Sequence, residues 1–207
     1  MLGSLAHCKE DSRMKKLLLA VALAGLGTPA MAALKVGDTA PDFSANASLA
    51  GKEFHFSLQD ALKKGPVVVY FYPSAFTKGC DIEAHTFAEN ADRFDAAHAS
   101  IIGVSADNIE RLNAFSSDPN YCAGKFPVAS DADQKIATSY KLTVAAGRPG
   151  QTDVRGVEIG HAFIERTTYV IGKNGKIIAT LSSKDDGLSP DAHVDKSLAL
   201  VQQLAAK

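Results

Sequence analysis

The sequence lacks a membrane-length apolar run, any block of like charge and any internal repeat. Its N-terminal apolar stretch, residues 17–27, is shorter than the roughly 20 residues that a membrane-spanning helix needs. The 207 residues carry 22 basic and 23 acidic side chains, a formal net charge of −1. Such a near-neutral surface gives no electrostatic reason to expect nucleic acid or an anionic membrane as partner.

The first 32 residues have the pattern of a secretion signal. Met14-Lys15-Lys16 supplies a basic segment, residues 17–27 an apolar segment, and Ala30-Met31-Ala32 a small-x-small cleavage site. We predict that residues 1–32 are an upstream extension and a cleaved signal peptide, running from about Met14 to Ala32, and that the mature protein is periplasmic or secreted. The alternative is a buried N-terminal helix or an uncleaved anchor.

Cysteine is scarce, with three residues in the whole chain. Cleavage after Ala32 removes Cys8 and leaves 175 residues with a net charge of −3, enough for one domain over residues 33–207. Cys80 and Cys122 then remain in an oxidising compartment, where two cysteines are a candidate disulfide. A static structural bridge is one interpretation, and the surroundings of Cys80 favour a chemical role.

Those surroundings have the sequence YFYPSAFTKGCDIE over residues 70–83. An apolar strand-like run is followed by a loop and then by Cys80, which opens a helical pattern. Backbone N–H groups and the helix dipole at such a junction favour the anionic form of a thiol. The thiolate is the nucleophilic form, so the pattern predicts sulfur chemistry.

The remaining patterns predict an α/β fold with a mixed sheet in a single domain. Continuous apolar runs indicate buried strands, three- and four-residue spacing indicates helices, and Asn174-Gly175 indicates a hairpin. Asp107 is a plausible helix cap, and residues 143–160 are Gly-rich and polar, hence a loop. Strands are predicted at 67–72, 100–105, 126–129, 162–171 and 176–182, and helices at 56–64, from 80 to about 97, 108–115, 133–140 and 190–206.

The residues 70–83 resemble the peroxidatic motif of peroxiredoxins, which are thioredoxin-fold thiol peroxidases. The nearest branch is the Q group, also called bacterioferritin-comigratory proteins. The segments GDTAPDF, IIGVSAD, FPVASDAD and RTTYVIGKNGKI resemble further landmarks of the family in the expected order, across residues 36–182. The resemblance implies a thioredoxin-like fold with a mixed sheet flanked by helices.

The resemblance also implies a reaction and roles for residues. Cys80 as thiolate would attack the O–O bond of a hydroperoxide and become sulfenic acid. Arg166 would stabilise the thiolate and the charge on the departing oxygen. Thr77 would supply a hydroxyl and a helix cap, Pro73 would shape and shield the pocket, and Glu83 would orient the arginine.

The sequence departs from the family pattern near the nucleophile. Lys78-Gly79 and Asp81 replace more usual residues, and an acid beside Cys80 should oppose ionisation of the thiol. Position 85 is His85, where many members of the branch place a second cysteine. The resemblance of the surrounding segment makes Cys122 the substitute, which would form an intramolecular disulfide with Cys80; a static bridge and a one-cysteine mechanism remain open.

Rival functions fit the sequence less well. A thiol–disulfide oxidoreductase needs C-x-x-C, and Glu83 occupies the second position. A cysteine hydrolase needs a base near the sulfur, and His85 points away along the helix. An exported thioredoxin-fold binding protein with a structural Cys80–Cys122 disulfide remains the alternative. The histidines form no spaced cluster and the glycines no phosphate-binding motif, so we expect no metal or cofactor.

The resemblance implies partners as well as chemistry. The substrate would be a hydroperoxide, either hydrogen peroxide or an organic one, and the reductant a thioredoxin-like or other thiol protein. The branch suggests a monomer or weak homodimer. No nucleic acid is expected, and no membrane association after removal of the signal.

Overall fold

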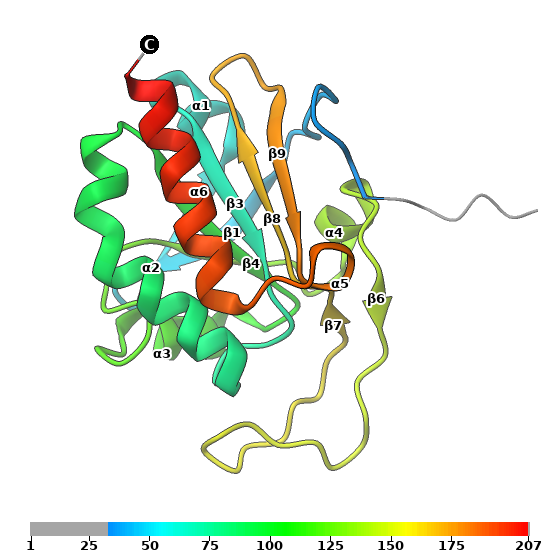
Figure 1. The fold of residues 1–207 in the computed structure, drawn as a ribbon. Coiled ribbons are helices and arrows are strands. Elements are labelled where there is room, and N and C mark those ends of the chain that lie inside the picture. Colours follow the sequence, from blue (N-terminus) through cyan, green and yellow to red (C-terminus); the bar gives the residue numbers. More distant parts are fainter. Residues whose placement is uncertain (1–32, 207) are drawn as a thin grey trace, which may run out of the picture. The chain divides into compact units, whose positions relative to one another are not determined.

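A seven-stranded mixed sheet runs through the part of the chain that the computed structural model describes, residues 33–206 (Figure 1). The strand order is β2-β1-β5-β4-β3-β8-β9, in which β3, β4 and β5 are parallel and the other pairings antiparallel. The strands of this sheet are β1 (Ser44–Leu49), β2 (Lys52–Ser57), β3 (Val67–Phe71), β4 (Ser100–Ser105), β5 (Val128–Ser130), β8 (Thr167–Ile171) and β9 (Ile177–Ser182).

Helices cover both faces of this sheet because its central strands are apolar on both sides. Alternate residues of β3 enter two separate apolar clusters, with Val67 and Val69 on one face and Val68 and Tyr70 on the other. The first face is covered by α1 (Leu58–Lys64) and α4 (Lys135–Ser139), the second by α2 (Lys78–Ala96), α3 (Ile109–Ser117) and α6 (Pro190–Ala205). In Figure 1, α2 and α6 lie side by side on that second face. This confirms the predicted mixed sheet flanked by helices.

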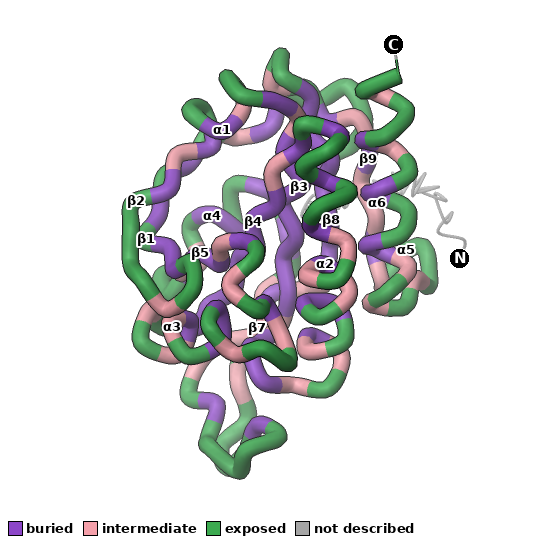
Figure 2. Tube along the Cα trace, turned by 90° about the vertical axis from the view of Figure 1, so that its left-hand side faces the viewer, coloured by how far each residue is buried: buried purple, intermediate pink, exposed green. Residues whose placement is uncertain are grey.

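A second, two-stranded sheet carries a long connection away from the main one. It pairs β6 (Val144–Ala145) with β7 (Phe163–Ile164), and residues 146–162 between them form what we call the excursion. The excursion is mostly exposed, whereas the central strands of the main sheet are buried (Figure 2). The predicted single strand over residues 162–171 was therefore wrong: it breaks at Glu165–Arg166, where the chain passes from β7 to β8. The predicted loop over residues 143–160 contains β6.

The β1–β2 hairpin was not predicted. Its buried positions in β1 hold small residues such as Ala45 and Ala47, and β2 is largely exposed, so neither strand has a clear apolar alternation. Ala50 and Gly51 form the turn with positive φ angles of 51° and 77°. The helix predicted from residue 56 begins instead at Leu58, where Ser57 caps it by accepting a hydrogen bond from the backbone N–H of Asp60.

Other helix and strand boundaries differ from the predicted ones by a few residues. The cap of α3 is Asn108, whose side chain accepts a hydrogen bond from the N–H of Arg111, so the assignment of Asp107 as the cap was wrong. The hairpin from β8 to β9 turns at Asn174-Gly175 as expected, and Gly175 has a φ of 73°. A one-turn helix, α5 (Ser183–Asp186), was not predicted.

The described residues form one compact unit. None of their helices is both long and apolar enough to cross a membrane. The predicted signal peptide, residues 1–32, lies outside the described residues.

Candidate active site

Cys80 lies in the first turn of α2, directly after the loop that follows β3. It is 2% exposed and belongs to the apolar cluster beneath α2, α3 and α6. Thr77 occupies the N-cap position of the helix, but its side chain makes no cap bond; its Oγ1 donates to the carbonyl of Ser74 at 2.8 Å. Thr77 therefore secures the loop before the helix. Pro73 is half-buried in the same loop, next to Ser74.

Arg166 reaches Cys80 from the break between β7 and β8. Its Nη2 donates a hydrogen bond to Cys80 Sγ at 3.2 Å, and its Nη1 forms an ion pair with Glu83 Oε2. Glu83 is fully buried one turn after Cys80 on α2. A side-chain carbon at Gly79 would lie 3.2 Å from Nη2 of Arg166, so the glycine leaves room for the guanidinium. The structure thus brings together Cys80, Arg166 and Glu83.

The charge balance at Cys80 is set by burial against a few polar groups. Burial raises the pKa of the Cys80 thiol, while Arg166, the Thr77 hydroxyl and the backbone of Ser74 lower it. The net direction is upward. It differs from the ionised thiol expected from the motif, because the sequence shows the helix start and the cation but not the complete burial of the sulfur.

Burial and a neighbouring charge also act in opposite directions on the pKa of Glu83. Burial raises the pKa of its carboxyl to about 7, and the ion pair with Arg166 acts in the opposite direction. Its second carboxylate oxygen, Oε1, has no hydrogen-bond partner among the described residues. The ion pair holds the guanidinium through Nη1 while Nη2 contacts the sulfur, so Glu83 fixes the direction in which Arg166 presents Nη2.

Cys122 is fully buried and lies beyond the end of α3, in a series of turns. Both Cys122 and Cys80 are free thiols in the same apolar cluster. Burial raises the pKa of Cys122 well above its ordinary value, and the charges of Asp81 and Asp118 add to the effect. Cys122 is therefore protonated at neutral pH. The described residues show no hydrogen bond that joins it to the group of Cys80, Arg166 and Glu83.

An aromatic group lies between the two cysteine-bearing segments. The rings of Phe76 and Tyr121 meet edge to face at 5.3 Å, and Phe115 stacks on Tyr121 at 5.2 Å. The guanidinium of Arg155, from the excursion, lies 3.2 Å from the Phe76 ring centroid. Phe76 has a φ of 58°, which is an unusual conformation for an aromatic residue.

A second polar group, which was not predicted from the sequence, supports the loop before Cys80. We call it the Asp107 cluster: Ser74, Asp107, Arg111, Asp153 and His161. Asp107 accepts hydrogen bonds from Ser74 Oγ at 3.1 Å and from the backbone N–H of Ala75 at 2.8 Å. Arg111 lies between two carboxylates, with Nε 2.8 Å from Asp107 and Nη2 2.8 Å from Asp153.

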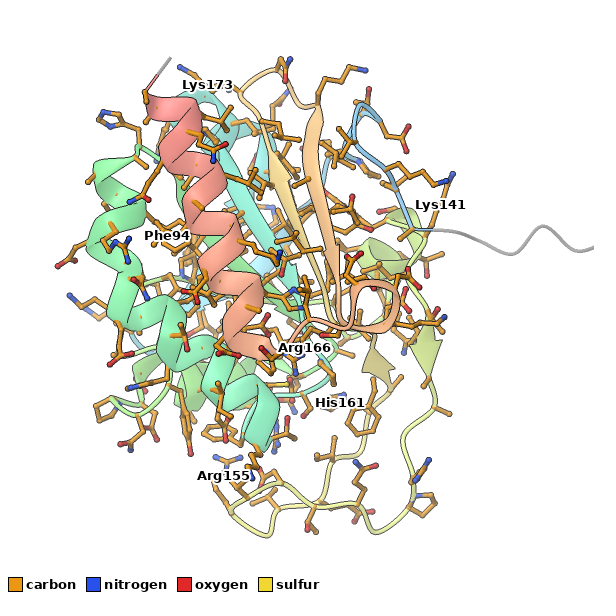
Figure 3. The ribbon with its side chains drawn as sticks, viewed as in Figure 1. Phe94, Lys141, Arg155, His161, Arg166 and Lys173 are labelled. Atoms are coloured by element: carbon orange, nitrogen blue, oxygen red, sulfur yellow. The ribbon has the colours of Figure 1, made fainter. Side chains whose placement is uncertain are left out.

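His161 completes the Asp107 cluster from the excursion, although its place in the sequence indicates only a loop or strand-edge residue. Figure 3 shows Arg166, His161 and Arg155 at the same end of the molecule. The signal for Asp107 was its position at the end of the IIGVSAD landmark. No sequence motif marks Asp153, because its partner Arg111 lies in a distant segment and only the fold brings the two together. Among residues 33–206, no group of three or more histidine, cysteine or acidic side chains is arranged to hold a metal ion.

Comparisons with known proteins identify the class that this fold and site define. Residues 36–180 match the model of the AhpC/TSA family. The structure is similar to the crystal structure of peroxidoxin BcpB from Mycobacterium tuberculosis, with a TM-score of 0.65, 30% identity, and coverage of 83% of this chain and 98% of that one. It is also similar to the bacterioferritin comigratory protein of Xanthomonas campestris, with a TM-score of 0.60, 25% identity, and coverage of 77% and 91%.

A plant protein gives the same result at the sequence level. The chloroplastic peroxiredoxin Q of Sedum lineare is 32% identical over 142 residues, which cover 69% of this chain and 66% of that protein. The fold and the relatives are those of thiol peroxidases with a thioredoxin-like fold. The chain belongs to the AhpC/TSA family, among the peroxiredoxins that include the Q and bacterioferritin-comigratory branch.

Proposed function

We propose that this protein is an exported peroxidase that reduces hydrogen peroxide and organic hydroperoxides at Cys80. The observation that carries the proposal is the contact of Arg166 Nη2 with Cys80 Sγ at 3.2 Å inside a nearly closed apolar site. A fixed guanidinium there stabilises the thiolate and then the charge that develops on the departing oxygen. The bacterioferritin comigratory protein of Xanthomonas campestris has alkyl peroxide reduction activity, which supports extending the substrate class to organic hydroperoxides.

The first step converts the Cys80 thiolate to sulfenic acid. The sulfur attacks one peroxide oxygen, the O–O bond breaks, and the second oxygen leaves as alkoxide or hydroxide and takes a proton to become alcohol or water. Arg166 donates to both charged species in turn. The Thr77 hydroxyl donates to the Ser74 carbonyl and secures the loop, both residues lower the pKa of Cys80, Pro73 shapes the pocket, and Glu83 holds the guanidinium.

The second step is resolution by Cys122. Its sulfur attacks the Cys80 sulfenic acid, forming the S–S bond and releasing water, and a thioredoxin-like dithiol protein then reduces the disulfide. Disulfide formation requires Cα atoms about 4.4–6.8 Å apart. We propose that the first turn of α2 and the turns around Cys122 rearrange to bring the two residues to this separation. The free thiols of the structure correspond to the reduced protein at the start of this sequence.

Peroxide consumption with dithiothreitol tests the proposal. We expect turnover by the wild type, none by Cys80→Ser, and initial oxidation but no intramolecular disulfide in Cys122→Ser. Mass spectrometry after one equivalent of peroxide must show Cys80 as sulfenic acid in Cys122→Ser and as a disulfide in the wild type. Undiminished turnover by Cys80→Ser would end the peroxidase proposal. A disulfide that resists dithiothreitol would instead support the alternative, a binding protein with a static bridge.

A further inference from the structure

His161 makes contacts that define its protonation state. Its Nδ1 lies 2.8 Å from the carbonyl oxygen of Ala162, which can only accept a hydrogen bond. Its Nε2 lies 2.7 Å from Asp107 Oδ1, and the carboxylate also only accepts. Both nitrogens must therefore carry protons for both contacts to be favourable, and the ring is an imidazolium paired with the buried Asp107 carboxylate.

The same histidine is linked to the loop before the nucleophile. Nε2 also lies 3.3 Å from Ser74 Oγ, which in turn donates to Asp107. The carbonyl of Ser74 accepts the Thr77 hydroxyl, and its backbone lowers the pKa of Cys80. The connection from the excursion to the sulfur therefore passes through His161, Asp107 and Ser74.

We propose that His161 is a positioning residue for the peroxidase reaction: as an imidazolium it holds Asp107 and Ser74 together and so fixes the loop that faces Cys80. The inference rests on the proposed function in one respect, that Cys80 is the attacking group. His161 belongs to the excursion and lies 81 positions beyond Cys80 in the sequence. It acts on the site through Ser74 and Asp107.

The contribution of His161 depends on pH in a direction that the contacts fix. The charged groups that face it are Asp107, just beyond the end of β4, and Arg111, on α3. Burial and the charge of Arg111 lower the pKa of His161, but the bonds to Asp107 and Ala162 outweigh them, so the net direction is upward. The ion pair between His161 and Asp107 is complete at low pH and is lost as pH rises through the raised pKa of His161. Ionisation of Cys80, by contrast, increases with pH. The two effects oppose each other.

The test is the pH profile of Cys80 oxidation in a single turnover, divided by the thiolate fraction measured on the same sample. For the wild type we expect this thiolate-specific rate constant to be level at low pH and to fall as His161 loses its proton. His161→Gln retains a donor nitrogen at only one of the two positions and carries no charge. Its rate constant should be about tenfold lower at low pH, the scale of one charge-assisted hydrogen bond, and independent of pH. His161→Lys should restore most of the rate and also remove the fall.

His85→Gln is the matched control. His85 also lies near a carboxylate, Glu89 at 3.4 Å, but on the exposed side of α2. This variant should keep the wild-type profile. A His161→Gln profile identical to that of the wild type would overturn the inference while leaving the peroxidase proposal intact, whereas failure of wild-type Cys80 to form sulfenic acid would overturn the proposed function itself.

One measurement does not depend on any variant folding. The ring nitrogens of His161 in the wild-type protein can be followed by nitrogen NMR against pH. We expect the ring to stay doubly protonated above the ordinary histidine pKa of about 6.5. A His161 ring that loses its proton at or below that ordinary value contradicts the inference.

Discussion

Cys80 shows how burial and charge compete over one side chain. The sulfur is almost inaccessible, which favours the neutral thiol, and Arg166 opposes this from 3.2 Å. Because the net direction is an elevated pKa, the thiolate is the minor form at neutral pH, and the reaction rate should rise as pH rises toward that pKa. Among the groups that lower the pKa of Cys80, the Arg166 guanidinium has the largest effect.

Substitution of Arg166 tests this balance. In Arg166→Gln we expect the pKa of Cys80 to rise further and the rate constant for peroxide to fall by about 10²–10³, the usual effect of losing one donor to a developing oxyanion. The ultraviolet absorbance of the thiolate against pH gives the first quantity and single-turnover kinetics the second. Arg93→Gln, on the exposed side of α2, is the control and should change neither.

His193 provides a prediction about acid stability. It is fully buried between the hydroxyls of Thr168 and Ser183, and burial together with the charge of Arg166 lowers its pKa to about 4. The unfolded chain binds this proton near pH 6.5. Stability supplied by the neutral ring is therefore complete above pH 6.5 and is lost as pH falls toward 4, amounting to about 3 kcal/mol. His193→Asn should flatten this part of the unfolding free energy against pH, measured by urea denaturation; an unchanged slope would contradict the assignment.

At the scale of elements, the loop before α2 and the turns after α3 are held together by aromatic rings. Phe76 and Tyr121 lie next to Thr77 and Cys122 in sequence, so we predict that their contact opens when the two sulfurs meet. The positive φ of Phe76 raises the free energy of the closed loop and favours that opening.

We predict that Tyr121→Ala forms the Cys80–Cys122 disulfide three- to tenfold faster after one equivalent of peroxide, on the scale of one aromatic pair. The measurement is the rate of disulfide appearance in quenched samples. Phe54→Ala removes a partly exposed ring of β2 and should leave the rate unchanged. A slower or unaltered rate in Tyr121→Ala would mean that this contact does not limit the rearrangement.

The elements differ in how far the sequence could predict them. β3 and α2 were predictable because a continuous apolar run and a regular alanine and phenylalanine spacing each have one simple interpretation. The β1–β2 hairpin has small or exposed residues and gave no such pattern. Arg166 was predictable from the family motif, whereas the Asp107 cluster joins residues up to 87 positions apart, and only the folded chain shows that they meet.

On the scale of the whole molecule, the active site depends on the strand order. β3 and β4 are parallel neighbours, so the loop that leads to Cys80 and the segment that carries Asp107 leave the same edge of the sheet. β8 lies on the other side of β3 and brings Arg166 to that edge. The excursion then supplies His161, Asp153 and Arg155 from beyond the sheet.

Export is the remaining prediction at this scale. Protein recovered from producing cells should begin at Ala33, as determined by N-terminal sequencing. Replacing Lys15 and Lys16 by glutamate should leave full-length chain inside the cell, because the basic segment of the signal is lost. The same change at Lys63 and Lys64, an exposed pair at the end of α1, is the control. Mature protein beginning at Ala33 despite the first change would contradict the prediction.

The expected monomer or weak homodimer also stays a prediction, which analytical sedimentation can test.

The concealment of both cysteines has a practical consequence for anyone who handles the reduced protein. Because both sulfurs are buried, alkylating reagents should label them slowly, mainly when the surrounding backbone opens. The labelling rate of the reduced protein therefore reports how often this part of the chain opens.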